Sequence, residues 1–134
     1  LADTGAVYAL LDRGDAWHER VRGWWAAALE PIRLPECILP EITYLLATRI
    51  SPAAEQAFVQ AVVTGEFTLE RHDPLDFARA ATLMGSYADL PLGFVDATVA
   101  ATAERLLVTT ILTTDRRHFG VLRPSHRPGF TLVP

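Results

Sequence analysis

Short apolar segments alternate along this chain with longer stretches of helical periodicity, and this alternation is the feature that most restricts the fold. Consecutive parallel strands need a crossover between them, which is usually a helix. Helices that cross over in this way cover both faces of the sheet. We therefore predict an α/β fold with a short parallel sheet. No internal repeat or low-complexity linker interrupts the pattern, so residues 1–134 are predicted to form a single domain.

The expected elements follow from this periodicity. Strands are expected over Leu1–Gly5, Ile32–Pro35, Phe67–Glu70, Ile111–Asp115 and, at the sheet edge, Phe130–Val133. Helices are expected over Ala6–Leu11, Ala16–Leu29, Leu39–Ile50, Ala53–Val63, Pro74–Tyr87 and Thr98–Leu107. Residues 116–128 contain four arginines and two histidines and are expected to form an irregular basic loop.

Some packing expectations are more specific. Asp15 is expected to cap the helix that begins at Ala16. Trp17 and Trp24 are seven residues apart and share a face, which favours core or interface packing, including a dimer surface, over a binding platform. The helix that starts at Pro74 is expected to bury Phe77, Ala80, Ala81 and Met84.

Composition limits the class of protein. Half of the residues are hydrophobic, which is enough for a buried core, and no apolar run is long enough to span a bilayer. Cys37 is the only cysteine, so no intramolecular disulfide or cysteine zinc site is expected, and a soluble cytoplasmic protein is predicted. The net charge of −4 argues against bulk electrostatic binding of nucleic acid, although all twelve basic residues are arginines, which clamp phosphates well.

Four acids occupy positions where a parallel α/β fold builds a binding site. Asp3 and Asp115 follow strands, whereas Glu41 and Asp96 lie at helix starts. Ligands bind outside the carboxyl ends of the strands in open α/β sheets, so these carboxylates are expected to converge. A pocket of unpaired carboxylates repels itself unless a cation is present. Oxygen ligands alone favour Mg²⁺ or Mn²⁺, and the histidines lack zinc-ligand spacing.

Such a pocket is suited to phosphodiester hydrolysis by a metal-activated water. The hydroxyls of Thr4, Thr113 and Thr114 are expected to orient ligands or the scissile phosphate. Arg116 and His118 follow Asp115 directly and are expected to contact RNA phosphates.

The acids belong to sequence motifs that resemble a known family. The motifs are Asp3-Thr4-Gly5, Asp15-Ala16-Trp17-His18, Pro40-Glu41, Leu92-Gly93-Phe94-Val95-Asp96-Ala97 and Thr113-Thr114-Asp115-Arg116-Arg117-His118-Phe119. Each motif alone is weak, but their order and spacing resemble the PIN-domain ribonucleases of the VapC toxin type. The resemblance covers essentially the whole chain. The family commonly has serine where this chain has Gly5.

The resemblance implies a three-layer α/β/α PIN-like domain that forms a homodimer. It places the metal-binding and catalytic acids at Asp3, Glu41, Asp96 and Asp115, with Asp89 near a further, less regular acidic position. It also implies an endoribonuclease toxin of a type II toxin–antitoxin module, dependent on Mg²⁺ or Mn²⁺ and held inactive by a cognate antitoxin.

Two other functions remain open from the sequence. The first is a non-catalytic PIN-like module that binds RNA or an antitoxin-like partner. The second is a phosphatase that forms an aspartyl phosphate. That chemistry requires an Asp-x-Asp motif at the first strand, where this chain has Asp3-Thr4-Gly5.

Overall fold

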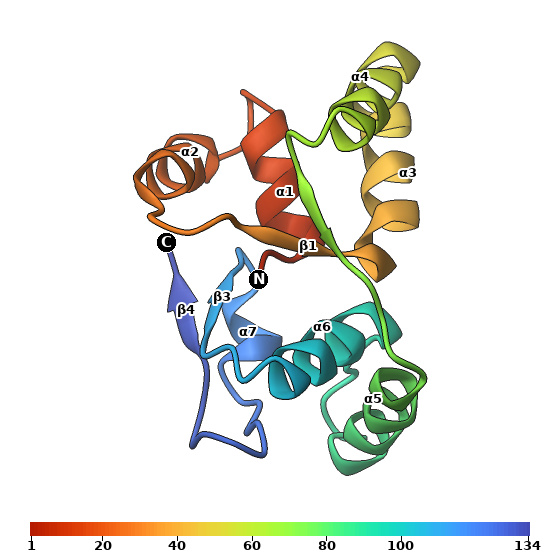
Figure 1. The fold of residues 1–134 in the computed structure, drawn as a ribbon, viewed down its shortest axis with the longest axis vertical. Coiled ribbons are helices and arrows are strands. Elements are labelled where there is room, and N and C mark those ends of the chain that lie inside the picture. Colours follow the sequence, from red (N-terminus) through yellow and green to blue (C-terminus); the bar gives the residue numbers. More distant parts are fainter.

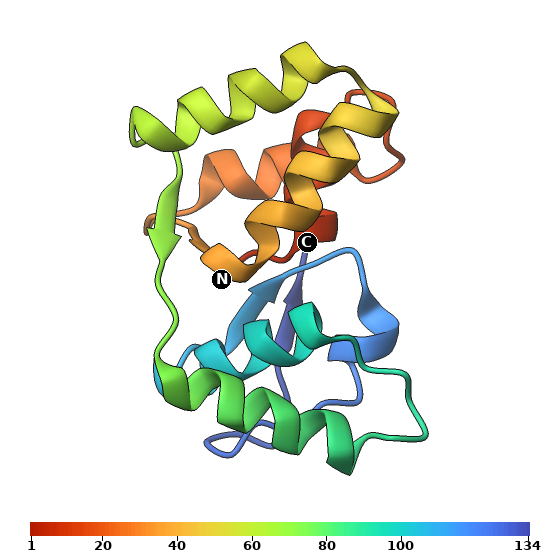
Figure 2. The same ribbon diagram turned by 90° about the vertical axis from the view of Figure 1, so that its right-hand side faces the viewer.

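The computed structural model describes all residues, 1–134, and places a short parallel sheet between two layers of helices. Helices α1 (Thr4–Leu11), α2 (His18–Ala27), α3 (Leu39–Arg49) and α4 (Pro52–Val63) lie on one side of the strands. Helices α5 (Pro74–Ser86) and α6 (Phe94–Arg105) lie on the other side, with α7 (Arg116–Phe119) beside α6 (Figures 1 and 2). The predicted three-layer α/β/α fold is confirmed.

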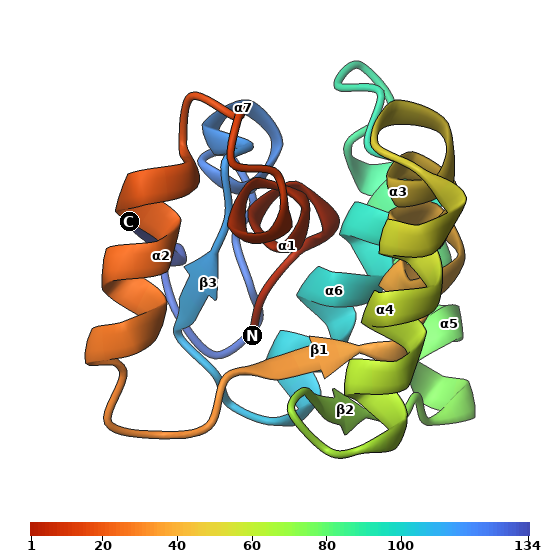
Figure 3. The ribbon, with the colours of Figure 1, turned by 90° about the horizontal axis from the view of Figure 1, so that it is seen from above.

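The sheet is built from two strand pairs that the N-terminal segment joins. Strand β1 (Arg33–Pro35) pairs in parallel with β2 (Thr68–Glu70), and β3 (Thr110–Leu112) pairs in parallel with β4 (Thr131–Val133). Ala2 forms a parallel bridge to Leu112 and donates its backbone N–H to Arg33 at 3.0 Å. The order across the sheet is therefore β4, β3, the N-terminal segment, β1 and β2. Figure 3 shows the N-terminus between β3 and β1.

Helix α6 packs closely because its residues are small. Every residue from Ala97 to Glu104 is buried, and this stretch lies between α5 and the strands. Alanine side chains allow the helix backbone to approach its neighbours closely. The apolar residues of β3, Ile111 and Leu112, are buried in the same core.

Several element boundaries differ from the predictions for local reasons. Helix α1 begins at Thr4 because the Asp3 side chain accepts a hydrogen bond from the backbone of Ala6 and caps the helix there. Helix α2 begins at His18, since Asp15 accepts from the backbone of Trp17 and caps the preceding turn. A 3-10 turn, η1 (Glu36–Ile38), also precedes α3.

The C-terminal half differs in two further ways. Helix α6 begins at Phe94, four residues earlier than predicted, so Asp96 lies in its first turn. Residues 116–119, predicted to lie in an irregular loop, form the short helix α7, because Asp115 caps it with hydrogen bonds from Arg117 and His118. Trp17, which precedes α2, and Trp24 in α2 were expected to pack in the core or at an interface, and both are partly buried against the core.

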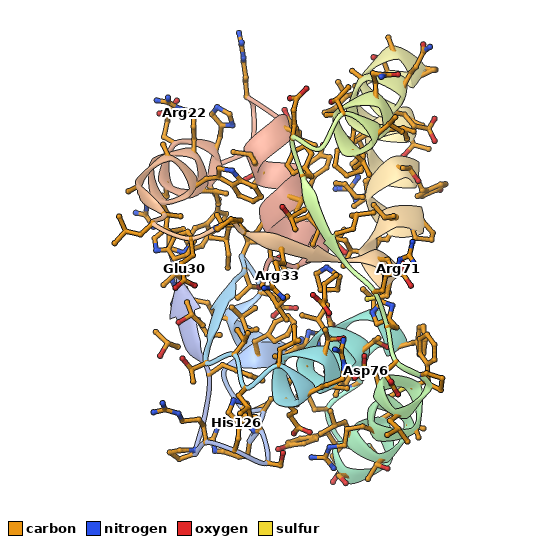
Figure 4. All side chains as sticks on the ribbon, viewed as in Figure 1. Arg22, Glu30, Arg33, Arg71, Asp76 and His126 are labelled. Carbon is orange, nitrogen blue, oxygen red and sulfur yellow. The ribbon has the colours of Figure 1, made fainter.

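The predicted buried face of α5 is wrong. Ala81 is exposed, and so are the side chains of Phe77 and Met84. The residues of α5 that are buried are Asp76, Ala80 and Leu83. Asp76, which is labelled in Figure 4, is held inward by the guanidinium of Arg105 on α6 with two contacts of 3.0 Å. An ion pair thus rotates the helix relative to its apolar pattern.

Candidate metal centre

Asp3 lies where the N-terminal segment leaves the sheet and α1 begins. Its backbone N–H donates to Leu112 at 3.0 Å, so the sheet fixes its position. One carboxylate oxygen accepts from the backbone N–H of Ala6 at 2.7 Å. The other accepts from the Thr113 hydroxyl at 2.5 Å. Asp3 is only 4% exposed, so its carboxylate is held inside the fold at the carboxyl edge of the sheet.

Asp115 lies three residues after the end of β3 and is hydrogen-bonded to the same threonine. Its backbone N–H donates to the Thr113 hydroxyl oxygen at 2.8 Å. One oxygen of its carboxylate accepts from the backbone N–H groups of Arg117 and His118, both at 2.9 Å. The hydroxyl of Thr113 thus connects Asp3 to Asp115, which are 112 positions apart in the sequence.

Asp96 reaches the same place from the first turn of α6. The Nδ1 atom of His118 lies 3.8 Å from Asp96 Oδ2 and 2.6 Å from Asp115 Oδ2. One potential ligand atom from each of these three residues lies within 4.8 Å of the others. Asp96 and Asp115 therefore converge, and the imidazole of His118 lies between them.

Glu41 is connected through the neighbouring threonine of the first motif. It lies in the first turn of α3 after Pro40, and its Oε2 atom accepts from the Thr4 hydroxyl at 2.6 Å. Glu41 also acts electrostatically on Asp96, because it is one of the charges that raise the pKa of that residue. Asp3, Asp96 and Asp115 are thus close enough to act on one another electrostatically, and Glu41 is close enough to act on Asp96.

Burial and mutual repulsion make these carboxylates unusual acids. Burial raises the pKa of Asp3 to about 7 despite the hydrogen bonds from Thr113 and Ala6, and the charges of Asp96 and Asp115 raise it further. Burial and the Asp115 carboxylate raise the pKa of Asp96 to about 6. Asp115 differs: burial acts to raise its pKa, but hydrogen bonds from the His118 backbone and ring hold it below its ordinary value.

The donor set of this cluster fits a hard divalent cation. None of the four acids forms an ion pair with an arginine, although the chain has twelve of them. The carboxylate oxygens are the ligand type that Mg²⁺ and Mn²⁺ prefer, with one imidazole nitrogen beside them. A cation at this position relieves the repulsion that raises the pKa values of Asp3 and Asp96.

The remaining predicted residues differ in how closely they approach this cluster. Thr114 forms no side-chain hydrogen bond, but its hydroxyl lies 2.5 Å from where a Cβ atom on Gly5 would lie. The space left by Gly5 is thus taken by the Thr114 hydroxyl. The guanidinium of Arg116 lies over the Trp17 ring at 5.7 Å and bonds to the carbonyl of Pro134. Asp89 is exposed in the turn before α6 and forms no ion pair.

Sequence reasoning underestimated one residue of the site. Thr113 was grouped with Thr114 as a neighbour of Asp115, but only Thr113 binds Asp3. The alternation of side chains along a strand was the available signal, because it turns Thr113 and Thr114 to opposite faces. The largest hollow, about 640 Å³, lies beside Leu1, Arg33 and Thr110 at the other ends of the strands. It contains none of the four acids, so hollow size alone does not locate the site.

The fold and the acids described above define an α/β protein with an acidic site at the carboxyl ends of the strands of a parallel sheet. The family model described as PIN domain matches residues 1–122. Ribonuclease VapC26 of Mycobacterium tuberculosis is 31% identical over 134 residues, which is all of this chain and 99% of the relative. The chain therefore belongs to the PIN domain family, among the proteins of the VapC type.

A solved structure agrees with the fold. The crystal structure of Mycobacterium tuberculosis VapC20, described as a Sarcin-Ricin loop cleaving toxin, matches with a TM-score of 0.79. The match covers 90% of this chain and 95% of the other at 22% sequence identity. No helix here is long and apolar enough to cross a membrane.

Proposed function

We propose that this protein is an endoribonuclease toxin of a type II toxin–antitoxin module that depends on Mg²⁺ or Mn²⁺. The observation that carries the proposal is the convergence of Asp96 and Asp115, buried enough to repel each other and left without an arginine. The names of the relatives, a ribonuclease and an RNA-cleaving toxin, support RNA as the substrate. A cognate antitoxin, a second copy of the chain in a homodimer, a cytoplasmic location and a single domain over residues 1–134 belong to the same proposal.

The residues have separate roles in this proposal. Asp3, Asp96 and Asp115 would hold the cation, and Glu41 would hold it directly or through water. Held there, a divalent ion supplies a nucleophile near neutral pH by lowering the pKa of a bound water.

The hydroxyls beside the acids support this role. Thr113 orients Asp3, and Thr4 orients Glu41, so each carboxylate is fixed before substrate arrives. Arg116 and His118 lie beside Asp115 and are proposed to contact the RNA backbone, and Asp89 is proposed as an additional acid of lower importance.

Replacement of Asp96 by Asn tests the proposal. The variant keeps the size of the side chain and removes one ligand charge, so RNA cleavage in Mn²⁺ is expected to fall by roughly 100-fold or more. Glu30→Gln is the matched control, because it removes one negative charge from the far edge of the sheet. Cleavage by Asp96→Asn at the parent rate would contradict the assignment.

The same experiment distinguishes a ribonuclease from the alternative, a non-catalytic binding module. A binding module would retain RNA or partner binding but show no metal-dependent cleavage in the parent protein. Sequencing the RNA ends that the parent and Asp96→Asn proteins produce would distinguish true cleavage from contamination, and it would identify the cleaved bond.

A further inference from the structure

A second hollow shares a wall with the acidic cluster. It has a volume of about 490 Å³, within the range of roughly 300–1,000 Å³ typical of small-molecule sites. Glu41 lines it together with residues of η1, α5, α6 and the segment before α5. A group bound in this hollow therefore lies next to a proposed metal ligand.

The hollow has an aromatic wall that the fold leaves uncovered. Phe77 and Phe94 line it, and their side chains are 44% and 51% exposed. Their rings are stacked, with centroids 6.0 Å apart and an angle of 20° between the planes. His72 continues the row, with its ring centroid 5.3 Å from that of Phe77. Exposed, nearly parallel rings are the surface on which unpaired bases stack.

The hollow also has a polar edge, which Glu36 and His72 form. The His72 side chain is only 3% exposed, and its Nε2 atom is buried without a hydrogen-bond partner. Its backbone N–H donates to Glu36 Oε1 at 3.4 Å, and its Nδ1 atom lies 3.6 Å from the same oxygen. His72 thus positions Glu36, whose side chain is 41% exposed. The edge retains hydrogen-bonding capacity that the chain itself does not use.

We propose that this hollow binds one unpaired RNA base beside the scissile phosphate, and that Glu36 selects a base carrying an amino group. The inference rests on the proposed ribonuclease function. Phe77 and Phe94 stack against the base, and the carboxylate oxygen of Glu36 that His72 does not contact accepts from its amino group. Adenine, cytosine and guanine carry such a donor, whereas uracil does not.

The chemistry of the hollow favours a base over a second protein surface. Its apolar lining includes two flat rings and is bordered by two carboxylates, Glu36 and Glu41, so an acidic peptide segment would be repelled. A base is flat, uncharged and rich in donors at one edge. It is also covalently attached to the phosphate that the neighbouring cluster would cleave.

Binding of short single-stranded oligonucleotides tests this proposal. The protein is the Asp96→Asn variant with Mg²⁺, which prevents cleavage, and the probes are fluorescently labelled oligo(A), oligo(C) and oligo(U). Oligo(A) and oligo(C) are expected to bind about tenfold more tightly than oligo(U). Phe94→Leu is expected to lower their affinity about tenfold, and Phe94→Tyr to retain it, because only an aromatic ring stacks.

Two further variants make the test specific. Glu36→Gln is expected to abolish the preference over oligo(U) while oligo(U) binds as before. Tyr44→Leu is the matched control, because Tyr44 is an exposed aromatic residue of α3 that does not line the hollow. Equal affinity for all three probes, or an equal loss in Tyr44→Leu, would overturn the proposal.

Sedimentation of the same variants identifies a different occupant. If Phe94→Leu binds RNA normally but changes the oligomeric state, a second copy of the chain covers the hollow and the base site is ruled out. Failure of the base proposal leaves metal-dependent cleavage by the parent protein untouched. Unimpaired cleavage by Asp96→Asn would instead contradict the ribonuclease assignment.

Discussion

Helix α6 carries an acid near each end, Asp96 and Glu104, and the surroundings of the two carboxylates differ. Near the C-terminal end, Glu104 accepts hydrogen bonds from the Arg79 guanidinium at 2.6 and 2.9 Å. In the first turn, Asp96 faces Asp115 and His118 and has no arginine partner. Burial raises the pKa of Asp96 to about 6, whereas for Glu104 the bonds from Arg79 outweigh burial and lower the pKa.

The difference separates acids that stabilise the fold from acids that are available to a ligand. Asp76 and Glu70 are compensated by Arg105, just as Glu104 is by Arg79. Paired carboxylates of this kind have no need of a cation. The unpaired group at the other end of α6 destabilises the metal-free protein, and this cost is what a bound cation can offset.

The largest change in the free energy of unfolding is expected near the C-terminal end of α6, where the acids are paired with arginines. Arg105→Ala leaves the buried Asp76 without its partner, which should lower the free energy of unfolding by ~3 kcal/mol. Urea denaturation measures this change. Arg105→Lys retains the charge without the planar guanidinium and should lose less. A loss below ~1 kcal/mol would mean that the ion pairs at this end of α6 are not what stabilises it.

A change of opposite sign is expected at the unpaired end. Asp96→Asn removes a buried, repelled charge and should raise the free energy of unfolding of the metal-free protein at pH 8 by ~1–3 kcal/mol. Glu104→Gln, the matched change at the other end, should lower it. Added Mg²⁺ should raise the melting temperature of the parent protein more than that of Asp96→Asn. Changes of the same sign in both variants would remove the contrast between the two ends.

The pH dependence of stability should reveal the same contrast. Asp3 and Asp96 have folded pKa values of about 7 and 6, above the ordinary value of 3.8, so between pH 4 and 7 the folded state binds more protons than the unfolded state. The contribution of each group to stability therefore falls as pH rises through this range, by up to ~1.4 kcal/mol per pH unit.

Glu104 and Asp115 have lowered pKa values, so their contribution is present above the unfolded pKa and is lost as pH falls through the folded pKa. Urea titrations of the metal-free protein from pH 2 to 8 cover both ranges. Subtracting the Asp96→Asn curve from the parent curve isolates the contribution of Asp96 to stability. A difference that does not depend on pH would contradict the raised pKa of Asp96.

The smallest change in the free energy of unfolding is expected from the tight packing between Gly5 and Thr114, beside the acidic cluster. A Cβ atom on Gly5 would lie 2.5 Å from the Thr114 hydroxyl, so Gly5→Ala should lower the free energy of unfolding by ~1 kcal/mol. Thr114→Ala removes the conflicting atom and should relieve most of this loss in the double variant. A double-mutant cycle measures the coupling, and purely additive changes would show that the two positions do not interfere.

Much of the fold follows from local pattern. The order of most strands and helices was predicted correctly because apolar periodicity and caps are properties of neighbouring residues. Helix α7 and the turn η1 were not predicted, and the strand expected over Leu1–Gly5 is reduced to one bridge at Ala2. The strands around Leu34, Ile111 and Leu132 lie where they were expected. The buried face of α5 could not be predicted, because the partner that turns Asp76 inward, Arg105, lies 29 positions later in the sequence.

The sequence predicted which acids form the candidate site, but not the contacts that link them to one another. Asp3, Glu41, Asp96 and Asp115 stand out because the carboxyl edge of a parallel sheet is where such folds bind ligands. That Thr113 bridges Asp3 and Asp115, and that His118 lies between Asp96 and Asp115, depends on side-chain directions across separate segments. The aromatic wall formed by His72, Phe77 and Phe94 has no sequence motif at all.

The sequence by itself determined the order of the main strands and helices, the α/β class and the identity of the candidate acids, because these depend on residue type and near neighbours. The tertiary structure decided which acids are neutralised and which are left free. Coulomb energy and desolvation depend on distance and burial in space. An arginine and an aspartate that are far apart along the chain pair only if the fold brings them together, and in this protein it does so for Asp76 but not for Asp96.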